Sequence, residues 1–283
     1  MEAYTDFAKV YDTFMDETPY DVWGDFVSSL IDKYGVSKPV KSCADGQSKE
    51  DSKEYSTVED SEQALNEEKN LVVELGCGTG SFTQVMKGLG YDIMGIDMSP
   101  EMLNLAREKS AESGLDIMYL EQDMRELDLY CTAGTIVSVC DSINYVLEDE
   151  EIIETFKLVN NFLYPGGVFI FDFNTLHKYR DVIGDTTIAE NREDCSFIWD
   201  NYYDDESHIN EYDLTIFAKV DAQKELFARS VETHYQRGYT LDEMKSFVKA
   251  AGLVFITAID ADTHESPSDD SERIYIVARE QGK

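Results

Sequence analysis

Short apolar runs alternate with segments of helical periodicity from residue 71 onwards. Leu71 to Val73 form one such run, and the segment 81–89 repeats its apolar residues every three or four positions. Continuous apolar runs are typical of strands buried on both faces of a parallel sheet. Apolar residues at every third or fourth position are typical of amphipathic helices. Further strands are predicted at 91–97, 117–120, 134–140 and 168–171, and further helices at 100–106 and 152–163. The order predicts an α/β domain built around a parallel sheet.

Different patterns flank and interrupt this repeat. Residues 2–34 predict two helices that end at Pro19 and Tyr34 and carry a stripe of aromatic residues. Residues 195–231 alternate apolar and polar positions between charged turns, which is typical of antiparallel strands. Thr240 and Glu243 have the spacing of a capping box, and the helix that they begin is followed by strands at 253–259 and 273–278.

The segment 74–80 reads E-L-G-C-G-T-G and follows the first strand directly. Gly76, Gly78 and Gly80 allow a tight turn in which the backbone approaches a ligand closely, because no Cβ intervenes. An acid precedes the turn and no lysine follows it, so the spacing differs from dinucleotide and P-loop fingerprints. About twenty residues further on, Asp97 ends the second strand, where a carboxylate reaches ribose hydroxyls in nucleotide-binding βαβ units.

These motifs resemble those of the class I S-adenosylmethionine (AdoMet) methyltransferases. The E-x-G-x-G-x-G stretch matches their first motif, and L-x-P-G-G before the fifth strand recurs in the family. The string F-A-K-V-Y-D-T-F-M-D resembles the N-terminal segment of members that act on small molecules. The resemblance covers residues 2–34 and 71–280. It implies a Rossmann-like, seven-stranded, mostly parallel sheet with a reversed last strand, and a small antiparallel β cap inserted between strands five and six.

The resemblance also implies a division of the chain. Residues 1–36 would be N-terminal helices that cover the cofactor site. Residues 37–69 lie outside the resemblance, and their richness in charged residues, Ser and Gln predicts an acidic flexible insertion with a short helix near 59–68. Residues 70–190 and 238–283 would form the AdoMet-binding core. Residues 191–237 would form the cap.

In the family, the acid at Asp97 holds the ribose hydroxyls, while Asp123 and the backbone of Met124 bind adenine. The cofactor-binding residues expected from the resemblance are Tyr11, Glu74, Gly76, Cys77, Gly78, Gly80, Asp97, Met98, Asp123, Met124 and Asp141. AdoMet is a sulfonium cation without phosphate, so a site of close backbone and carboxylates suits it. S-adenosylhomocysteine would be the product.

Methyl transfer from AdoMet is an in-line SN2 displacement, in which most of the rate comes from orienting the acceptor lone pair. Asp141 is the ionisable group expected nearest to the methyl, with Tyr11 and His234 as further catalytic candidates. The expected acceptor-binding residues are Tyr4, Asn144, Tyr145, Trp199, Tyr202 and Arg237. Tyr203 and Tyr239 are further polar aromatic candidates in the cap. The alternative is that most of these aromatic side chains only pack in a half-buried sheet.

Three other functions are compatible with parts of the pattern. A metal-assisted O-methyltransferase would use Asp141, Asp172 and Asn174 as Mg²⁺ ligands, but the spacing departs from the adjacent D-N pair of that subgroup. The chain could instead be a non-catalytic AdoMet-binding module or an NAD-dependent enzyme. The glycine spacing argues against NAD, and no metal is expected.

The amino-acid composition limits the kinds of molecule that the chain is expected to bind. Asp and Glu number 58 against 24 Lys and Arg, giving a formal net charge of −34. Such a surface repels nucleic acid and anionic membranes, and it also keeps the chain in solution. Five cysteines without a C-x-x-C pair and the lack of a signal-peptide pattern predict a reduced, cytoplasmic protein. We expect a monomer or homodimer that methylates a small-molecule acceptor at N or O.

Overall fold

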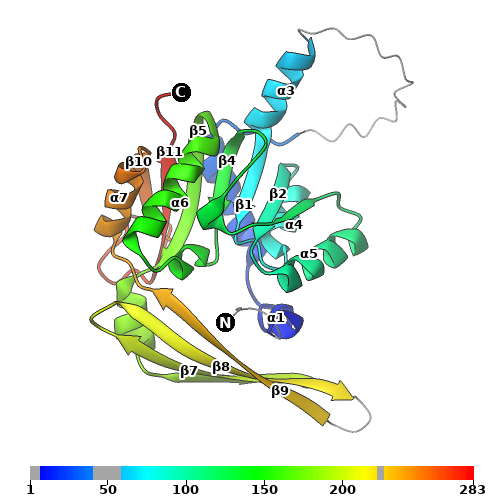
Figure 1. The fold of residues 1–283 in the computed structure, drawn as a ribbon, viewed down its shortest axis with the longest axis vertical. Helices are drawn as coiled ribbons and strands as arrows, with labels where there is room; N and C mark the ends of the chain where they lie inside the picture. The colour runs from blue at the N-terminus through cyan, green and yellow to red at the C-terminus, as the bar shows by residue number, and fades with distance from the viewer. Residues whose placement is uncertain (1–6, 41–58, 222–225) are drawn as a thin grey trace.

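The computed structural model describes residues 7–40, 59–221 and 226–283. It contains a seven-stranded sheet flanked by helices and a separate four-stranded sheet that lies beyond one end of the first sheet (Figure 1). No helix within the described ranges is long and apolar enough to cross a membrane. Tyr4, one of the predicted acceptor contacts, lies outside the described residues.

The large sheet has the order β10-β11-β5-β4-β1-β2-β3. Its strands are β1 (Leu71–Leu75), β2 (Asp92–Asp97), β3 (Met118–Glu121), β4 (Ala133–Ser138), β5 (Leu163–Asn174), β10 (Val254–Asp260) and β11 (Arg273–Arg279). Neighbours pair in parallel except around β11, which is antiparallel to both β5 and β10. The predicted fold class, a mostly parallel sheet with a reversed last strand, is therefore confirmed.

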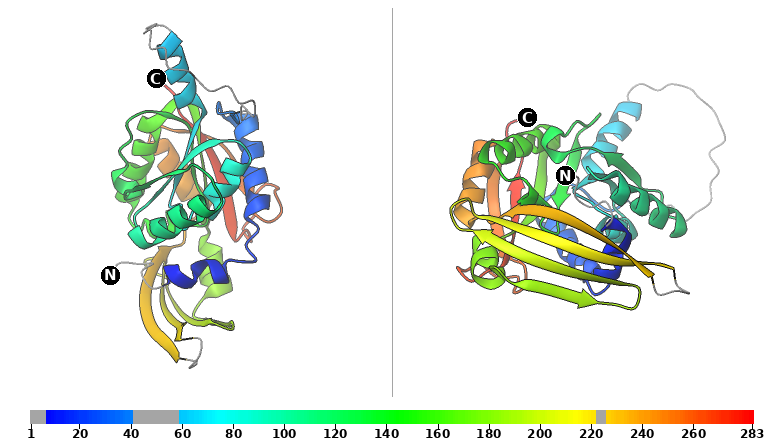
Figure 2. Two further views of the ribbon diagram at one scale, coloured as in Figure 1. Left: turned by 90° about the vertical axis from the view of Figure 1, so that its right-hand side faces the viewer. Right: turned by 60° about the horizontal axis from the view of Figure 1, so that its bottom comes forward.

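Helices cover both faces of this sheet (Figure 2). The described helices are α1 (Ala8–Phe14), α2 (Tyr20–Tyr34), α3 (Glu59–Asn70), α4 (Ser81–Gly88), α5 (Pro100–Glu112), α6 (Asp149–Phe162) and α7 (Leu241–Ala250), with short helices η1 (Met124–Glu126), η2 (Ser142–Tyr145) and η3 (Lys178–Ile183). The side chains of α6 and α7 pack with Phe169 and Phe171 in one core cluster. Those of α2 and α4 pack with Val168 and Ile170 in another. The strict alternation of β5 residues between the two clusters explains its continuous apolar run.

Local signals set several element ends as predicted. Ser99 accepts a hydrogen bond from the Met102 amide at the start of α5, with Pro100 as the first helical residue. Thr240 and Glu243 form the predicted capping box of α7. The P-G-G turn was predicted to precede the fifth strand, but it lies inside β5. Gly166 has φ +75° there, and the pairing of β5 with β4 continues beyond the turn after a shift in register.

The second sheet contains β6 (Thr187–Asn191), β7 (Cys195–Asp204), β8 (Ile209–Asp221) and β9 (Leu226–Arg237), all antiparallel. It is inserted between β5 and β10, where a cap was predicted. The alternating segment predicted at 195–231 did not include β6, which is a short, largely exposed edge strand without periodicity. Helix α1 lies between this cap and the core (Figure 1), and Val10 of α1 belongs to the apolar cluster of the inner cap face.

Gly134 of β4 has no room for a side chain, because a Cβ there would lie 1.8 Å from the Lys69 carbonyl oxygen and 2.5 Å from Ser37 Oγ. We expect Gly134→Ala to lower the free energy of unfolding by about 1–3 kcal/mol, the usual cost of overpacking. Urea denaturation measures this. The control is Gly88→Ala in α4, where a Cβ meets nothing within 4 Å. Equal stabilities of the two variants would contradict the prediction.

Candidate functional site

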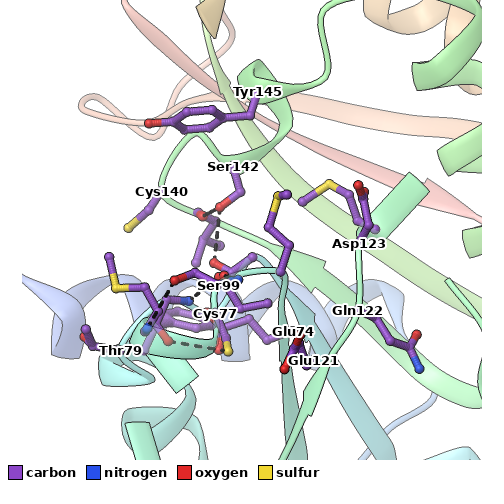
Figure 3. A pocket seen from close by; sticks show the side chains of 18 of the residues that line it. Glu74, Cys77, Thr79, Ser99, Glu121, Gln122, Asp123, Cys140, Ser142 and Tyr145 are labelled. Atoms are coloured by element: carbon purple, nitrogen blue, oxygen red, sulfur yellow. Dashed lines mark hydrogen bonds between the residues drawn. The ribbon is translucent and has the colours of Figure 1, made fainter. Parts of the chain in front are cut away.

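A cavity of about 300 Å³ lies where the carboxyl ends of β1, β2 and β4 meet. Open α/β sheets bind their ligands at this edge. The glycine turn after β1, with Cys77 and Thr79, forms one part of its wall, and Tyr145 from η2 forms another (Figure 3). Asp123, after β3, lies at a third position along the wall. The predicted cofactor residues Gly76, Gly78, Met98 and Met124 also line it.

The three glycines of the turn are all left-handed, with φ between +53° and +73°. A Cβ on Gly76 would lie 2.5 Å from Ser142 Oγ, and one on Gly80 would lie 2.5 Å from the Tyr119 hydroxyl. A Cβ on Gly78 would meet no protein atom within 4 Å, and Gly78 borders the cavity. Gly80 does not line the cavity, so it allows the turn to pack closely against Tyr119 of β3 and Ala106 of α5 rather than to approach a ligand.

Two carboxylates support this turn. Asp97 at the end of β2 accepts hydrogen bonds from the amides of Gly78 and Ser99, both at 2.8 Å. Its burial outweighs these bonds and raises its pKa. Glu74, at the end of β1, lies almost fully buried, accepts a hydrogen bond from the Thr83 hydroxyl, and has its pKa raised to about 8 by burial.

Asp123 lies at the start of η1, where its carboxylate accepts a hydrogen bond from the Arg125 amide at 2.9 Å and pairs with the guanidinium at 2.6 Å. Burial opposes ionisation of Asp123, but the contacts with Arg125 prevail and lower its pKa. Arg125 also pairs with Glu151, so this cation of the cavity wall is already neutralised by two carboxylates.

Helix α1 covers the cavity and places Tyr11 in its wall. Asp12 accepts hydrogen bonds from the Thr79 hydroxyl at 2.6 Å and from Lys109 Nζ at 2.8 Å, and Lys109 also donates to Ser81 at 2.7 Å. These bonds tie α1 to the glycine turn and to α5. On its other side, the ring of Phe14 packs edge-on against that of Phe197 in the cap, with centroids 4.7 Å apart.

After β4 the chain makes two consecutive left-handed residues, Cys140 (φ +59°) and Asp141 (φ +52°). The fully buried Asp172 carboxylate accepts both of their amides, at 3.1 and 2.8 Å. Burial raises the pKa of Asp172 to about 6, against the opposing effect of Arg273 at 3.7 Å. Cys140 lines the cavity, whereas Asp141 does not. The Asp141 carboxylate instead accepts a hydrogen bond from Gln236 Nε2 of the cap at 2.7 Å.

The prediction that Asp141 lies nearest to the reacting methyl therefore has no support from its position. The alternative Mg²⁺ site has no support from the positions of its residues either. The Asp172 oxygens accept hydrogen bonds from backbone amides, and the Asn174 side-chain oxygen accepts one from Lys178 at 3.0 Å. Among the residues that the structure describes, no group of three or more potential ligands gathers to hold a metal.

Tyr145 and His234, far apart in the chain, come together at the cavity. The Tyr145 hydroxyl lies 3.2 Å from His234 Nδ1 and 2.7 Å from the Tyr212 hydroxyl. The His234 ring stacks on Tyr212, and its Nε2 lies 3.4 Å from a Glu232 oxygen. Sequence reasoning missed Glu232 and Tyr212. The available signal was the spacing of Glu232 and His234, which places both on one face of a strand.

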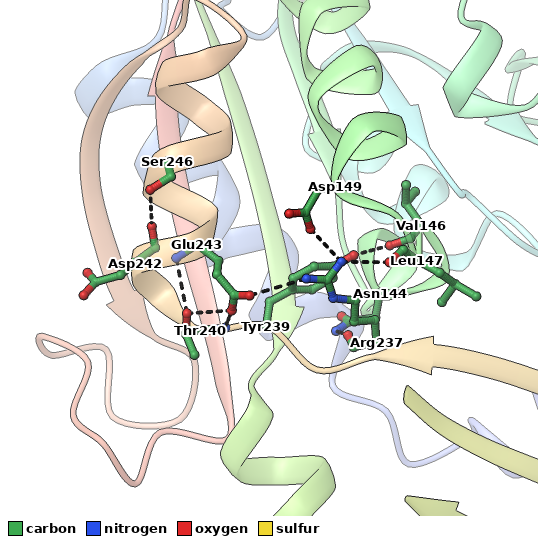
Figure 4. A network of polar contacts seen from close by, with 10 residues as sticks. All are labelled: Asn144, Val146, Leu147, Asp149, Arg237, Tyr239, Thr240, Asp242, Glu243 and Ser246. Atoms are coloured by element: carbon green, nitrogen blue, oxygen red, sulfur yellow. Dashed lines mark hydrogen bonds and ion pairs between the residues drawn. The ribbon is translucent and has the colours of Figure 1, made fainter. Parts of the chain in front are cut away.

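Arg237 and Asn144 do not face the cavity but form a network between cap and core (Figure 4). Arg237 donates to the Leu147 carbonyl at 2.9 Å and to Asp149 at 2.7 Å. Asn144 is fully buried and donates to the carbonyls of Asn174 and Arg237. Tyr239 bonds the Val146 carbonyl. Arg237 and Asn144, predicted to bind the acceptor, thus connect the cap to the core, and neither lines the cavity.

The remaining cap candidates also lie outside the cavity wall. Trp199 packs on Tyr212 and donates from Nε1 to Asn201 at 2.8 Å. Tyr202 is 62% exposed, because its strand position points away from the inner face. Tyr203 is half-buried in the cap. The predicted alternative, that most of these aromatic residues only pack, describes them better.

The wall chemistry fits a nucleoside that carries positive charge and no phosphate. Carboxylates at the ends of β1 and β2 can accept from hydroxyl and ammonium groups, and the glycine turn offers backbone at close range. Arg125 is the cation among the described wall residues, and its charge is already paired.

Comparison with known proteins agrees with this chemistry. A methyltransferase-domain family matches residues 72–167. A Bacillus subtilis protein with the name methyltransferase YqeM is 30% identical, covering 98% of this chain and 96% of its own length. A Geobacillus protein, also named a methyltransferase, is 29% identical over 98% of this chain and 99% of its own length.

Solved structures share the fold at lower identity. An AdoMet-dependent methyltransferase from Clostridium acetobutylicum has a TM-score of 0.77 at 23% identity, covering 99% of this chain and 100% of that chain. The AdoMet-bound amino pentose methyltransferase CalS10 from Micromonospora echinaspora has a TM-score of 0.64 at 15% identity, with 99% of both chains covered.

The raised pKa of Glu74 predicts a pH dependence of stability. A carboxyl with an ordinary value of 4.5 and a folded pKa of about 8 makes the folded state bind more protons than the unfolded state in that window. Its contribution to stability is therefore complete below about pH 4.5 and is lost as pH rises to about 8. Urea unfolding between pH 5 and 8 should show a flatter dependence for Glu74→Gln than for the wild type. Parallel curves would contradict the assignment.

Proposed function

We propose that this chain, which belongs to the class I AdoMet-dependent methyltransferases, transfers the methyl group to a nitrogen or oxygen atom of a small polar acceptor. AdoMet is its cofactor. The observation that carries the proposal is that one covered cavity joins a cofactor-type wall, made by the glycine turn and strand-end carboxylates, to a second wall that carries Tyr145.

The chain's own residues supply binding and orientation. Asp97 would accept the ribose hydroxyls, the turn at Gly76 and Gly78 would border the amino-acid portion, and Asp123 with Met124 would flank adenine. Glu74 lies beneath the turn, where the positive charge of bound AdoMet would favour ionisation of this otherwise protonated carboxyl. Bound AdoMet supplies a methyl group that is already activated by the sulfonium. Because the leaving group needs no protonation, the protein contributes mainly by holding the acceptor in line and excluding water.

A small acceptor suits the enclosure. Tyr11 of α1 and Tyr145 of η2 line the same cavity as the cofactor-type wall, so the acceptor would share an enclosed space with AdoMet. The amino pentose named for CalS10 is an acceptor of this size class. The net charge of −34 disfavours nucleic acid as the acceptor.

Asp97→Ala should weaken AdoMet binding about 100-fold or more, because hydrogen bonds from two hydroxyls to a charged group are lost. Calorimetric titration with AdoMet and with S-adenosylhomocysteine measures this. The matched control is Asp92→Ala at the other end of β2, where the exposed carboxylate pairs with Lys87 at 3.4 Å. Wild-type protein that binds NAD and neither of these ligands would overturn the proposal.

Lys109→Met should loosen α1 over the cavity, since Lys109 bonds Asp12, Thr79 and Ser81 together. We expect the dissociation rate of AdoMet to rise about threefold to tenfold, a modest effect because the ion pair is partly exposed. Stopped-flow fluorescence measures the rate. Lys157→Met, which removes an exposed lysine of α6 that pairs with Glu154, should leave it unchanged.

A further inference from the structure

We propose that Glu232, His234 and Tyr145 form a proton relay that deprotonates the methyl acceptor. The acceptor atom would therefore enter the site with a proton that it must lose, as a hydroxyl or an ammonium group. This inference rests on the proposed function and deepens it, because it names the protonation state of the acceptor and the groups that change it.

Geometry gives the relay a direction. Tyr145 is the member that lines the cavity, and its hydroxyl lies 3.2 Å from Nδ1 of His234. His234 is buried behind it, with 2% of its surface exposed. The ring of Tyr212 stacks on His234 with centroids 4.9 Å apart and planes within 3°. This stack holds the imidazole plane so that Nδ1 faces Tyr145.

The Glu232 carboxylate determines which ring nitrogen of neutral His234 carries the proton. Glu232 is 5% exposed, and one of its oxygens lies 3.4 Å from His234 Nε2. Its other oxygen accepts a hydrogen bond from the Phe7 amide at 3.0 Å, which orients the carboxylate. A carboxylate beside Nε2 favours the proton on that nitrogen and leaves Nδ1 as a hydrogen-bond acceptor. The Tyr145 hydroxyl then donates to Nδ1, while the Tyr212 hydroxyl, 2.7 Å away, donates to Tyr145.

The transfer step balances. The acceptor's proton passes to the Tyr145 oxygen as the Tyr145 proton passes to His234 Nδ1. The acceptor atom uses the freed electron pair to bond to the methyl carbon, and the carbon–sulfur bond breaks with its electrons going to sulfur. His234 ends as an imidazolium opposite the Glu232 carboxylate, and before the next turnover it returns the proton through the Tyr145 hydroxyl, which lines the cavity.

The alternative base, Asp141, lacks this access. It is absent from the cavity wall and its carboxylate is engaged by Gln236. Tyr212, Asp141 and Tyr179 are further titratable groups close to this cluster among the described residues, and burial raises the pKa of Tyr212 well above its ordinary value. Tyr212 thus stays protonated and serves as a donor to Tyr145 rather than as a base.

The first test is histidine-selective ¹⁵N NMR of the AdoMet-bound protein at pH 8. The chain has only four histidines, and His234→Gln identifies the resonance. We expect neutral His234 protonated on Nε2, with an Nδ1 shift that changes in Tyr145→Phe because a hydrogen bond is lost. Glu232→Gln should redistribute the proton between the two nitrogens. Neutral His234 with its proton on Nδ1 would overturn the relay, since Nδ1 could not accept one.

The second test measures kcat and AdoMet affinity with catechol, 4-hydroxybenzoate, putrescine and glucosamine as acceptor probes. His234→Gln and Tyr145→Phe should lower kcat about 100-fold or more, the usual contribution of a general base, while the AdoMet Kd changes less than twofold. Tyr145→Phe retains the ring and decides the question if His234→Gln does not fold. Unchanged kcat in a folded variant would overturn the relay.

The pH profile separates the two acceptor types. Glucosamine ionises below the phenols, so a pH above the pKa of its ammonium group but below that of the phenol groups should restore kcat with glucosamine in the variants, whereas with catechol and 4-hydroxybenzoate the loss should persist. If the protein methylates none of these probes, the NMR measurement of the His234 tautomer alone tests the relay. Failure of the proposed function itself shows separately, as wild-type protein that does not bind AdoMet.

Discussion

The fully buried carboxylate of Asp172 holds two backbone amides at the end of β4, and much of the site is arranged around this contact. Cys140 and Asp141 both take left-handed angles that non-glycine residues adopt only at an energetic cost of the order of 1–3 kcal/mol each. Hydrogen bonds from both amides to one carboxylate offset that cost. With a pKa of about 6, Asp172 remains ionised at neutral pH and keeps both oxygens as acceptors.

This turn connects the three parts of the molecule. Directly after it, η2 begins and carries Tyr145 into the cavity wall. The Asp141 side chain leaves the turn towards the cap and bonds Gln236, while Arg237, the next residue, reaches back to Leu147 and Asp149. The core, the cavity and the cap therefore meet at this turn. The hydrogen bonds of Asp141 and Arg237 there fix the position of the cap relative to the core.

The order of apolar runs, together with the glycine turn and Asp97, was enough to predict the sheet and the cofactor end of the cavity. Those features depend on periodicity and residue type, which the sequence displays directly. The acceptor end depends on where side chains point. Asp141 follows a strand end, as a catalytic acid would, but its positive φ directs the carboxylate to the cap. Glu232 resembles a surface charge on an alternating strand until the fold buries it beside His234.

Helix α1 takes part in two interfaces at once. Its Asp12 accepts a hydrogen bond from Thr79 of the glycine turn, and its Val10 and Phe14 pack against the inner face of the cap. Withdrawal of α1 to release a spent cofactor would also strip the packing from the sheet that carries Glu232 and His234. The two ends of the cavity are therefore coupled through α1, so that a movement that frees one end also loosens the other.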